Sequence, residues 1–100
     1  MPERFAATAS VPTDAPQRYA KQLASHLGRR LEVHEHEDGT RIVFTDGDCV
    51  LHSGPGALEL RASAESTEAL EQVKDVVGRH LERFGQRNEL HVSWQAAKPA

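Results

Sequence analysis

The sequence lacks the patterns that mark secreted and membrane-embedded proteins. It contains a single cysteine, Cys49, so no internal disulfide can form and nothing indicates an oxidising compartment. No run of apolar residues is longer than three, whereas a membrane-spanning helix needs about 20. The first residues, Met-Pro-Glu-Arg, are not followed by the apolar segment of a signal peptide. We therefore expect a cytoplasmic protein with no membrane partner.

Aromatic residues are scarce, and there is no excess of basic charge. Aromatics make up 5% of the chain, and the net charge is −3 with the histidines neutral. A surface that binds single-stranded nucleic acid needs exposed aromatic rings, and contact with the phosphate backbone needs a basic face. We therefore expect no nucleic-acid partner.

What the sequence does contain is the composition of one globular domain. Of its 100 residues, 38% are hydrophobic and 27% are charged. A chain of this length has room for one hydrophobic core and can fold without disulfides or metal. We predict a single domain over residues 1–100, with a frayed tail over residues 95–100.

Hydrophobic periodicity predicts two helices and six strands. Alternation at every second residue indicates strands, and apolar spacings of three and four indicate helices with one apolar face. Gly28 is expected to end the first helix in a left-handed conformation, and Gly78, inside the second helix, to mark a close backbone approach. The expected strands cover residues 4–11, 31–37, 40–45, 48–53, 57–62 and 90–94, and the expected helices cover about 14–28 and 66–84.

This order of elements, β-α-β-β-β-β-α-β, predicts an α+β fold. Strands joined by short turns pair antiparallel, so the sheet should be mostly antiparallel, with five to six strands. Each helix has one apolar face, and so does the sheet. The simplest arrangement is therefore two layers, with both helices on one face of the sheet and the other face open.

Turn signals in the middle of the chain suggest one candidate site. If Asp38-Gly39 and Asp46-Gly47 are two-residue turns, then His36, Arg41 and His52 lie side by side on the open face. Two histidines flanking an arginine suit an anion or a carboxylate ligand. The alternative interpretation is that these side chains only line a solvated face.

A metal site on the same strands is not expected. His34 and His36 share a face, because residues two apart on a strand point the same way. A closed zinc site needs about four convergent ligands, and the cation of Arg41 opposes a divalent metal. We therefore predict no metal site and no cofactor.

His80 is a separate candidate, because it lies on or beside the apolar stripe of the second helix. It is either a ligand-binding or acid–base residue at the edge of a cleft, or a histidine hydrogen-bonded at the edge of the core. His26 on the first helix could approach the same cleft. Cys49 is expected to point into the core, and no nucleophile motif accompanies it, so we do not expect an enzyme.

Several segments resemble the bacterial domain-of-unknown-function family 2218. The resemblance is strongest over residues 76–84 (VVGRHLERF) and 89–94 (ELHVSW). It extends to residues 18–23 (RYAKQL), Asp46-Gly47 and Cys49, and covers nearly the whole chain. Gly85 and Gln86 depart from the pattern, where a small residue and an aromatic are expected. The resemblance implies a small stand-alone bacterial domain with no established activity, and some members lie beside, or are fused to, siderophore-interacting ferric reductases.

Two classes of function follow. The first is a small bacterial interaction module, associated through its family with iron or siderophore metabolism, which binds a protein partner or a second copy of itself. Val43 and Val50 on the open face of the sheet favour it, because exposed neighbouring apolar residues invite a partner. The alternative is a protein that binds a small molecule, an anion or a metal through surface or cleft histidines.

Overall fold

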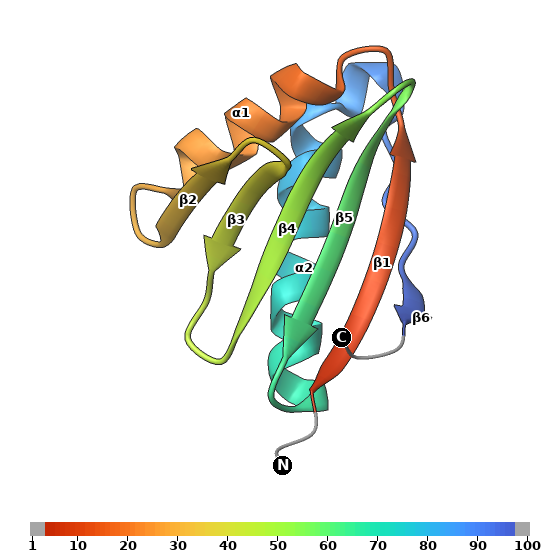
Figure 1. Cartoon of the computed structure of the whole chain (residues 1–100). Coiled ribbons are helices and arrows are strands. Elements are labelled where there is room, and N and C mark those ends of the chain that lie inside the picture. The colour runs from red at the N-terminus through yellow and green to blue at the C-terminus, as the bar shows by residue number, and fades with distance from the viewer. Residues whose placement is uncertain (1–3, 98–100) are drawn as a thin grey trace.

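The structure is a computed structural model that describes residues 4–97, and Figure 1 shows its α+β architecture. The order of elements along the chain is the predicted one, with a single turn of 3-10 helix, η1, added after the second helix. The elements are β1 (Phe5–Pro12), α1 (Pro16–Leu27), β2 (Glu32–His36), β3 (Gly39–Val43), β4 (Gly47–Gly54), β5 (Ala57–Ala64), α2 (Thr67–Phe84), η1 (Gln86–Asn88) and β6 (Gln95–Ala97).

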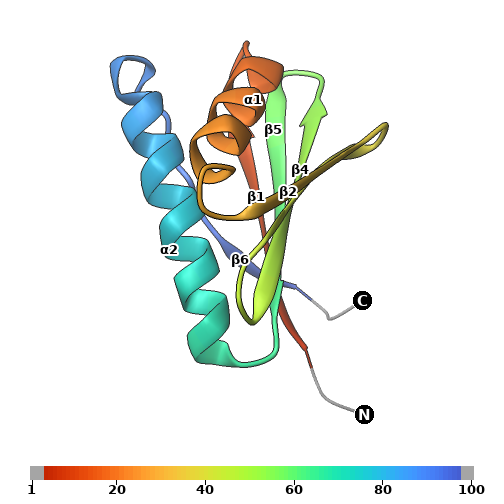
Figure 2. The same cartoon turned by 90° about the vertical axis from the view of Figure 1, so that its left-hand side faces the viewer.

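The strands form one sheet in the order β2-β3-β4-β5-β1-β6. All neighbouring pairs are antiparallel. Figure 2 shows both helices on the same side of this sheet, which leaves its other face uncovered. The predicted two-layer α+β fold is therefore confirmed.

The core lies between the sheet and the two helices. Every second residue of β4 and β5 points toward the helices, and six of these residues are fully or almost fully buried. They meet the apolar stripes of α1 and α2, whose residues follow helical spacing. The largest fully buried side chains are Tyr19, Leu23, Ile42, Leu51, Leu58, Leu60, Leu81, Val11, Val73, Val77 and Cys49.

The helix ends follow local capping rules with one exception. Ser66 caps α2 by accepting a hydrogen bond from the Ala69 backbone N–H at 3.0 Å, and a proline opens α1. The predicted left-handed stop at Gly28 is wrong, because Gly28 has a right-handed φ of −63°. A Cβ at this position would lie 2.7 Å from the Ala24 carbonyl oxygen, so close packing explains the glycine instead. Neither helix within residues 4–97 is both long and apolar enough to cross a bilayer.

The segment after α2 differs from its prediction. Leu90 and Val92 are buried, but residues 91–94 do not form a strand, and β6 covers residues 95–97. The Val92 backbone N–H donates to the Glu82 carboxylate at 3.0 Å, so a side chain of α2 replaces the partner that a neighbouring strand would supply. The close neighbours of Gly78 are side chains and not another backbone, because a Cβ there would lie 3.3 Å from Trp94 Nε1.

The predicted frayed tail begins too early. Residues 95–97 form β6 and pair with β1, where Ala6 lies opposite Ala97. The remainder of that prediction, residues 98–100, lies outside the described residues.

Both central hairpins have a register different from the predicted one. Glu37 and Asp38 form the first turn and Thr45 and Asp46 the second, so each glycine begins the following strand. At Gly39, φ is +153°, and a Cβ would collide with the Leu51 carbonyl oxygen. A Cβ at Gly47 would lie 2.5 Å from the Ser63 carbonyl oxygen. The neighbouring strand therefore leaves no room for a side chain at either position, and the positive φ of Gly39 disfavours one there as well.

Candidate functional site

The predicted row of His36, Arg41 and His52 is not formed. His36 lies opposite Gly39, and Arg41 lies between His34 on β2 and Val50 on β4. All three predicted residues lie on the uncovered face. The observed register of each hairpin differs from the predicted one by two residues, and an even difference leaves every side chain on its predicted face. The three side chains therefore do not make a common anion site.

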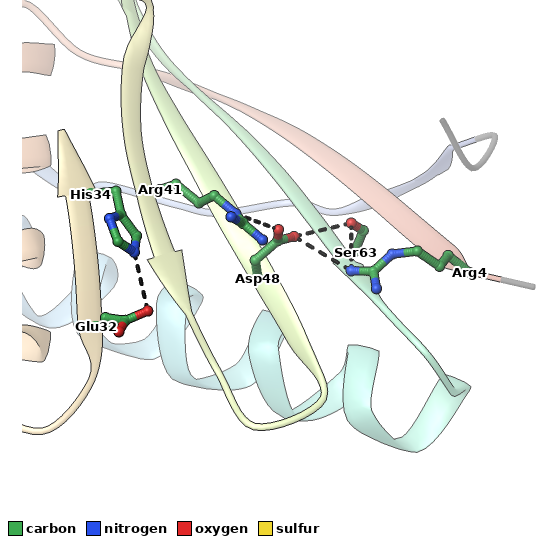
Figure 3. Close-up of polar contacts among 6 residues, drawn as sticks. All are labelled: Arg4, Glu32, His34, Arg41, Asp48 and Ser63. Carbon is green, nitrogen blue, oxygen red and sulfur yellow. Dashed lines mark hydrogen bonds and ion pairs between the residues drawn. The ribbon is translucent and has the colours of Figure 1, made fainter. Parts of the chain in front are cut away.

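Arg41 belongs instead to a polar network on the uncovered face, which Figure 3 shows in detail. Its Nε donates to the Asp48 carboxylate at 2.7 Å. The same carboxylate accepts a hydrogen bond from Ser63 Oγ at 3.1 Å and pairs with Arg4 at 3.8 Å. Because Asp48 already balances part of the charge of both arginines, this network should bind a further anion only weakly.

The histidines of the sheet are engaged locally. His34 contacts the Glu32 carboxylate at 3.1 Å, and its ring stacks on that of His36 with the ring centres 6.5 Å apart (Figure 3 shows the first contact). His52 Nδ1 lies 2.7 Å from the Asp38 carbonyl oxygen and donates to it. Across residues 4–97, no group of three or more histidine, cysteine or acidic side chains is placed to hold a metal ion.

His36 and His52 still share one feature, a groove beside the β2–β3 hairpin. This groove has a volume of about 470 Å³. Three acidic residues, Glu35, Glu37 and Asp38, also line it. Their charges oppose an anion, so the groove does not restore the predicted site.

The two histidines of the helices do come together, as expected if α1 and α2 shared a cleft. The ring centres of His26 and His80 are 4.8 Å apart, and both rings contact Phe84. His80 Nδ1 lies 2.6 Å from the Val76 carbonyl oxygen, one helical turn earlier. His80 therefore has features of both predicted roles: its ring is hydrogen-bonded at the edge of the core, and it also borders a cleft.

This cleft lies between the end of α1 and the middle of α2, and we call it the interhelical cleft. Its volume is about 500 Å³. Four of its lining residues are apolar and four are basic or imidazole side chains, and no acidic residue lines it. The lining residues are His26, Leu27, Arg29, Arg30, Leu31, Phe44, Val76 and His80.

Arg29 and Arg30 are the residues that sequence reasoning missed. Their side chains have no hydrogen bond or ion pair in the part of the chain that the structure describes. The sequence shows them directly after a helix, where basic residues commonly balance the negative helix end. Only the packing of α1 against α2 reveals that they border a cleft, which Phe44 also lines.

Cys49 has no reactive environment. It is fully buried on the inner face of β4, as predicted. Burial raises the pKa of its thiol, and the negative charge of Asp48 raises that pKa further. The thiolate needed for nucleophilic chemistry is therefore strongly disfavoured in the folded protein.

Comparisons with known proteins agree with this fold. A family model described as "Uncharacterized protein conserved in bacteria (DUF2218)" matches residues 8–95. The NMR structure of PA4090 from Pseudomonas aeruginosa is similar at a TM-score of 0.78 and 28% sequence identity, over 95% of this chain and 99% of that chain. No curated protein matches the chain.

Two designed proteins are similar in fold alone. Foldit4 has a TM-score of 0.55 at 13% identity, over 98% of this chain and 100% of its own. The designed protein LFR1 1, with a ferredoxin fold, has a TM-score of 0.57 at 10% identity, over 98% of this chain and 88% of its own. The family model, by contrast, covers most of the sequence, and so the chain belongs to the bacterial family DUF2218.

Proposed function

We propose that the protein binds a small organic anion in the interhelical cleft. The observation that carries the proposal is the pairing of an apolar lining with two arginines that have no acidic partner within residues 4–97. Ligand sites in proteins commonly combine mainly apolar walls with a few convergent polar groups. Of the cavities described above, the interhelical cleft fits that description best.

The charge distribution supports an anion as the ligand. The whole chain has a net charge of −3, yet Arg29 and Arg30 lie together at the cleft and no carboxylate lines it. Guanidinium groups bind carboxylates through paired hydrogen bonds, which gives them geometric as well as electrostatic preference. A carboxylate is therefore the ligand group that this rim suits.

The apolar lining supports a ligand with a hydrophobic body. Leu27 is buried in the core, and Leu31, Phe44 and Val76 are partly buried side chains packed against it. Covering apolar surface contributes about 25 cal/mol for each Å² removed from water. A free inorganic anion would leave this surface wet, whereas a carboxylic acid with an apolar part would cover it.

A purely structural role for the arginines predicts a different result. Basic side chains after a helix stabilise its negative end by about 0.3–1 kcal/mol. On that account, neutralising Arg29 and Arg30 lowers stability slightly and changes no binding. On the binding account, the same substitutions weaken anion binding in a protein that remains folded.

Titration with benzoate, followed by two-dimensional NMR, tests the proposal. We expect a dissociation constant on the order of millimolar, because benzoate has only about nine non-hydrogen atoms, and at about 0.5 kcal/mol for each they give about 4 kcal/mol of binding free energy. The shifted resonances should include those of His26, Phe44 and His80. The double variant Arg29→Gln/Arg30→Gln should bind at least about ten-fold more weakly.

The matched control is Lys21→Gln/Arg87→Gln, which removes the same charge from residues that do not line the cleft. It should bind benzoate as the wild type does. Equal weakening in both variants would mean a general charge effect, and no shifts at the cleft in wild type would refute the proposal.

A second candidate function is protein interaction through the uncovered sheet face. Val50 supports it, because it is 37% exposed and is the one exposed large hydrophobic side chain within residues 4–97. Arg41 and Arg61 flank it on the neighbouring strands. Light scattering over a range of concentrations tests self-association, which Val50→Asp should abolish. A monomer at every concentration would count against a second copy as the partner.

A further inference from the structure

We infer that the interhelical cleft prefers an aromatic carboxylate that carries a hydroxyl group, with His80 accepting the hydroxyl hydrogen bond. This inference rests on the proposed function and names its ligand class. Three observations carry it: the tautomer of His80, the free position of its second ring nitrogen, and the aromatic character of the cleft lining.

The tautomer of His80 follows from its backbone contact. Nδ1 lies 2.6 Å from the Val76 carbonyl oxygen, and a carbonyl oxygen can only accept a hydrogen bond. The proton must therefore be on Nδ1. In a neutral imidazole with a protonated Nδ1, Nε2 has no proton and is an acceptor. The fold thus sets the chemistry of the remaining nitrogen.

The acceptor at Nε2 is available to a ligand. Within residues 4–97, the only hydrogen bond of the His80 side chain is the one made by Nδ1. The ring is held by contacts with His26 and Phe84. It borders both the interhelical cleft and a second hollow that Asp75, Arg79 and Arg83 line. A fixed acceptor at the edge of an apolar surface selects for a ligand that brings a donor.

The lining of the cleft suits a flat aromatic ring. The ring of His26 lines the cleft and lies edge-on to Phe84, which is outside the lining, with the ring centres 5.7 Å apart and the planes at 79°. Phe44 adds another aromatic surface to the lining. Aromatic rings gain about 0.5–1.5 kcal/mol from such stacked and edge contacts beyond the area they bury.

The three groups give a ligand description with separate roles. Arg29 and Arg30 bind the carboxylate, the aromatic and apolar side chains cover the ring, and His80 Nε2 accepts from the hydroxyl. Benzoate satisfies the first two requirements and lacks the third. The effect of adding one hydroxyl therefore isolates the contribution of His80.

The test compares benzoate, 3-fluorobenzoate, 3-hydroxybenzoate and 4-hydroxybenzoate at pH 8, where free imidazole is mostly neutral. One of the two hydroxybenzoates should bind about five-fold more tightly than benzoate, the effect of one added hydrogen bond. 3-Fluorobenzoate has a substituent without a donor, and it should bind as benzoate does.

The variant His80→Phe keeps a ring and removes the acceptor. In this variant the ratio of the affinities for the preferred hydroxybenzoate and for benzoate should fall to about one, whatever its affinity for benzoate itself. The control His34→Phe, on the uncovered face of the sheet, should keep the preference. If His80→Phe folds poorly, the comparison of 3-fluorobenzoate with the two hydroxybenzoates in wild type still tests whether a donor group improves binding.

The outcomes separate this inference from the proposed function. If benzoate binds at the cleft and neither hydroxyl group improves binding, the inference is wrong and the proposed function stands. If the preference persists in His80→Phe, the hydroxyl binds elsewhere and the inference is again wrong. If none of the four acids binds, both fail together.

Discussion

The histidines of the helices and those of the sheet look alike in sequence but differ in structure. His26 and His80 lie 54 positions apart on separate helices, yet their rings are in contact and one of them has a defined tautomer. His34 and His36 are near neighbours on one strand, and they lie exposed on an edge strand beside their own carboxylates. Packing between elements, not proximity in sequence, makes the helical pair chemically distinctive.

The same contrast exists within β4, whose residues face either the core or the uncovered side. Cys49 is fully buried, and its neighbour Asp48 points to the other face with 15% of its side chain exposed. One residue is protected by the helices, and the other is stabilised by the polar network around it. The predictions below test the two sides separately.

The largest expected effect is a loss of stability at alkaline pH that depends on Cys49. Burial raises the pKa of its thiol in the folded protein, so the unfolded chain releases that proton first. The stabilising effect is fully present below the ordinary thiol pKa of about 8.5 and is lost as the pH rises above it. The unfolding free energy should fall by about 1.4 kcal/mol for each pH unit above that value.

Denaturant unfolding between pH 7 and pH 10.5 measures this slope, with Cys49→Ala as the control. Other groups titrate in the same range, but they do so in both proteins. The difference between the two curves therefore reports the thiol alone. Parallel curves above pH 9 would show that burial of Cys49 has no such effect.

A smaller effect is expected on the uncovered side when Asp48 is replaced by alanine. The carboxylate accepts hydrogen bonds from Arg41 and Ser63, and it is mostly shielded from water. Its loss should lower the unfolding free energy by about 1–2 kcal/mol, because both partners can rehydrate at the surface. Denaturant unfolding measures the change.

Binding of benzoate by Asp48→Ala should equal that of wild type, since the network lies on the face away from the helices. A large drop in affinity without unfolding would mean that the two sides of the domain are coupled. The Arg41→Ala variant and the double variant complete a cycle that isolates the pair.

The smallest effects are expected from a matched pair of histidine variants. His80→Ala removes two ring contacts and the hydrogen bond to Val76, and it should cost about 1 kcal/mol of stability. His34→Ala removes only an exposed contact with Glu32, and its effect should stay within about 0.5 kcal/mol. Thermal unfolding of both variants gives the comparison, and equal losses would contradict it.

Much of the fold could be predicted from the sequence, because each element has its own hydrophobic period. The inward positions of Cys49, Leu51, Leu58 and Leu60 were predictable from alternation alone, and all four are buried. The serine before α2 and the glycine at position 78 are also local signals, and the structure explains both by a cap and by the close packing of Trp94.

The candidate site could not be predicted in the same way. The error in the row around Arg41 comes from reading Gly39 and Gly47 as turn residues, whereas a neighbouring strand requires glycine at both positions. The interhelical cleft depends on how α1 and α2 pack, which no local pattern in the sequence specifies. The negative end of α1 is a sufficient local reason for Arg29 and Arg30 in the sequence. That they line the interhelical cleft together with Phe44 is therefore visible only in the structure.

The pairing of β6 with β1 has a practical consequence for engineering this domain. Ala6 lies opposite Ala97, so the start of β1 and the end of β6 meet at one corner of the sheet (Figure 1). That corner is on the edge opposite β2, whereas the interhelical cleft adjoins Leu31 and Phe44 beside β2 and β3. A reporter domain joined next to Ala6 or Ala97 would therefore lie at the edge of the sheet away from the cleft. A short linker from residue 97 to residue 5 would allow a circular permutant opened at the turn formed by Glu37 and Asp38.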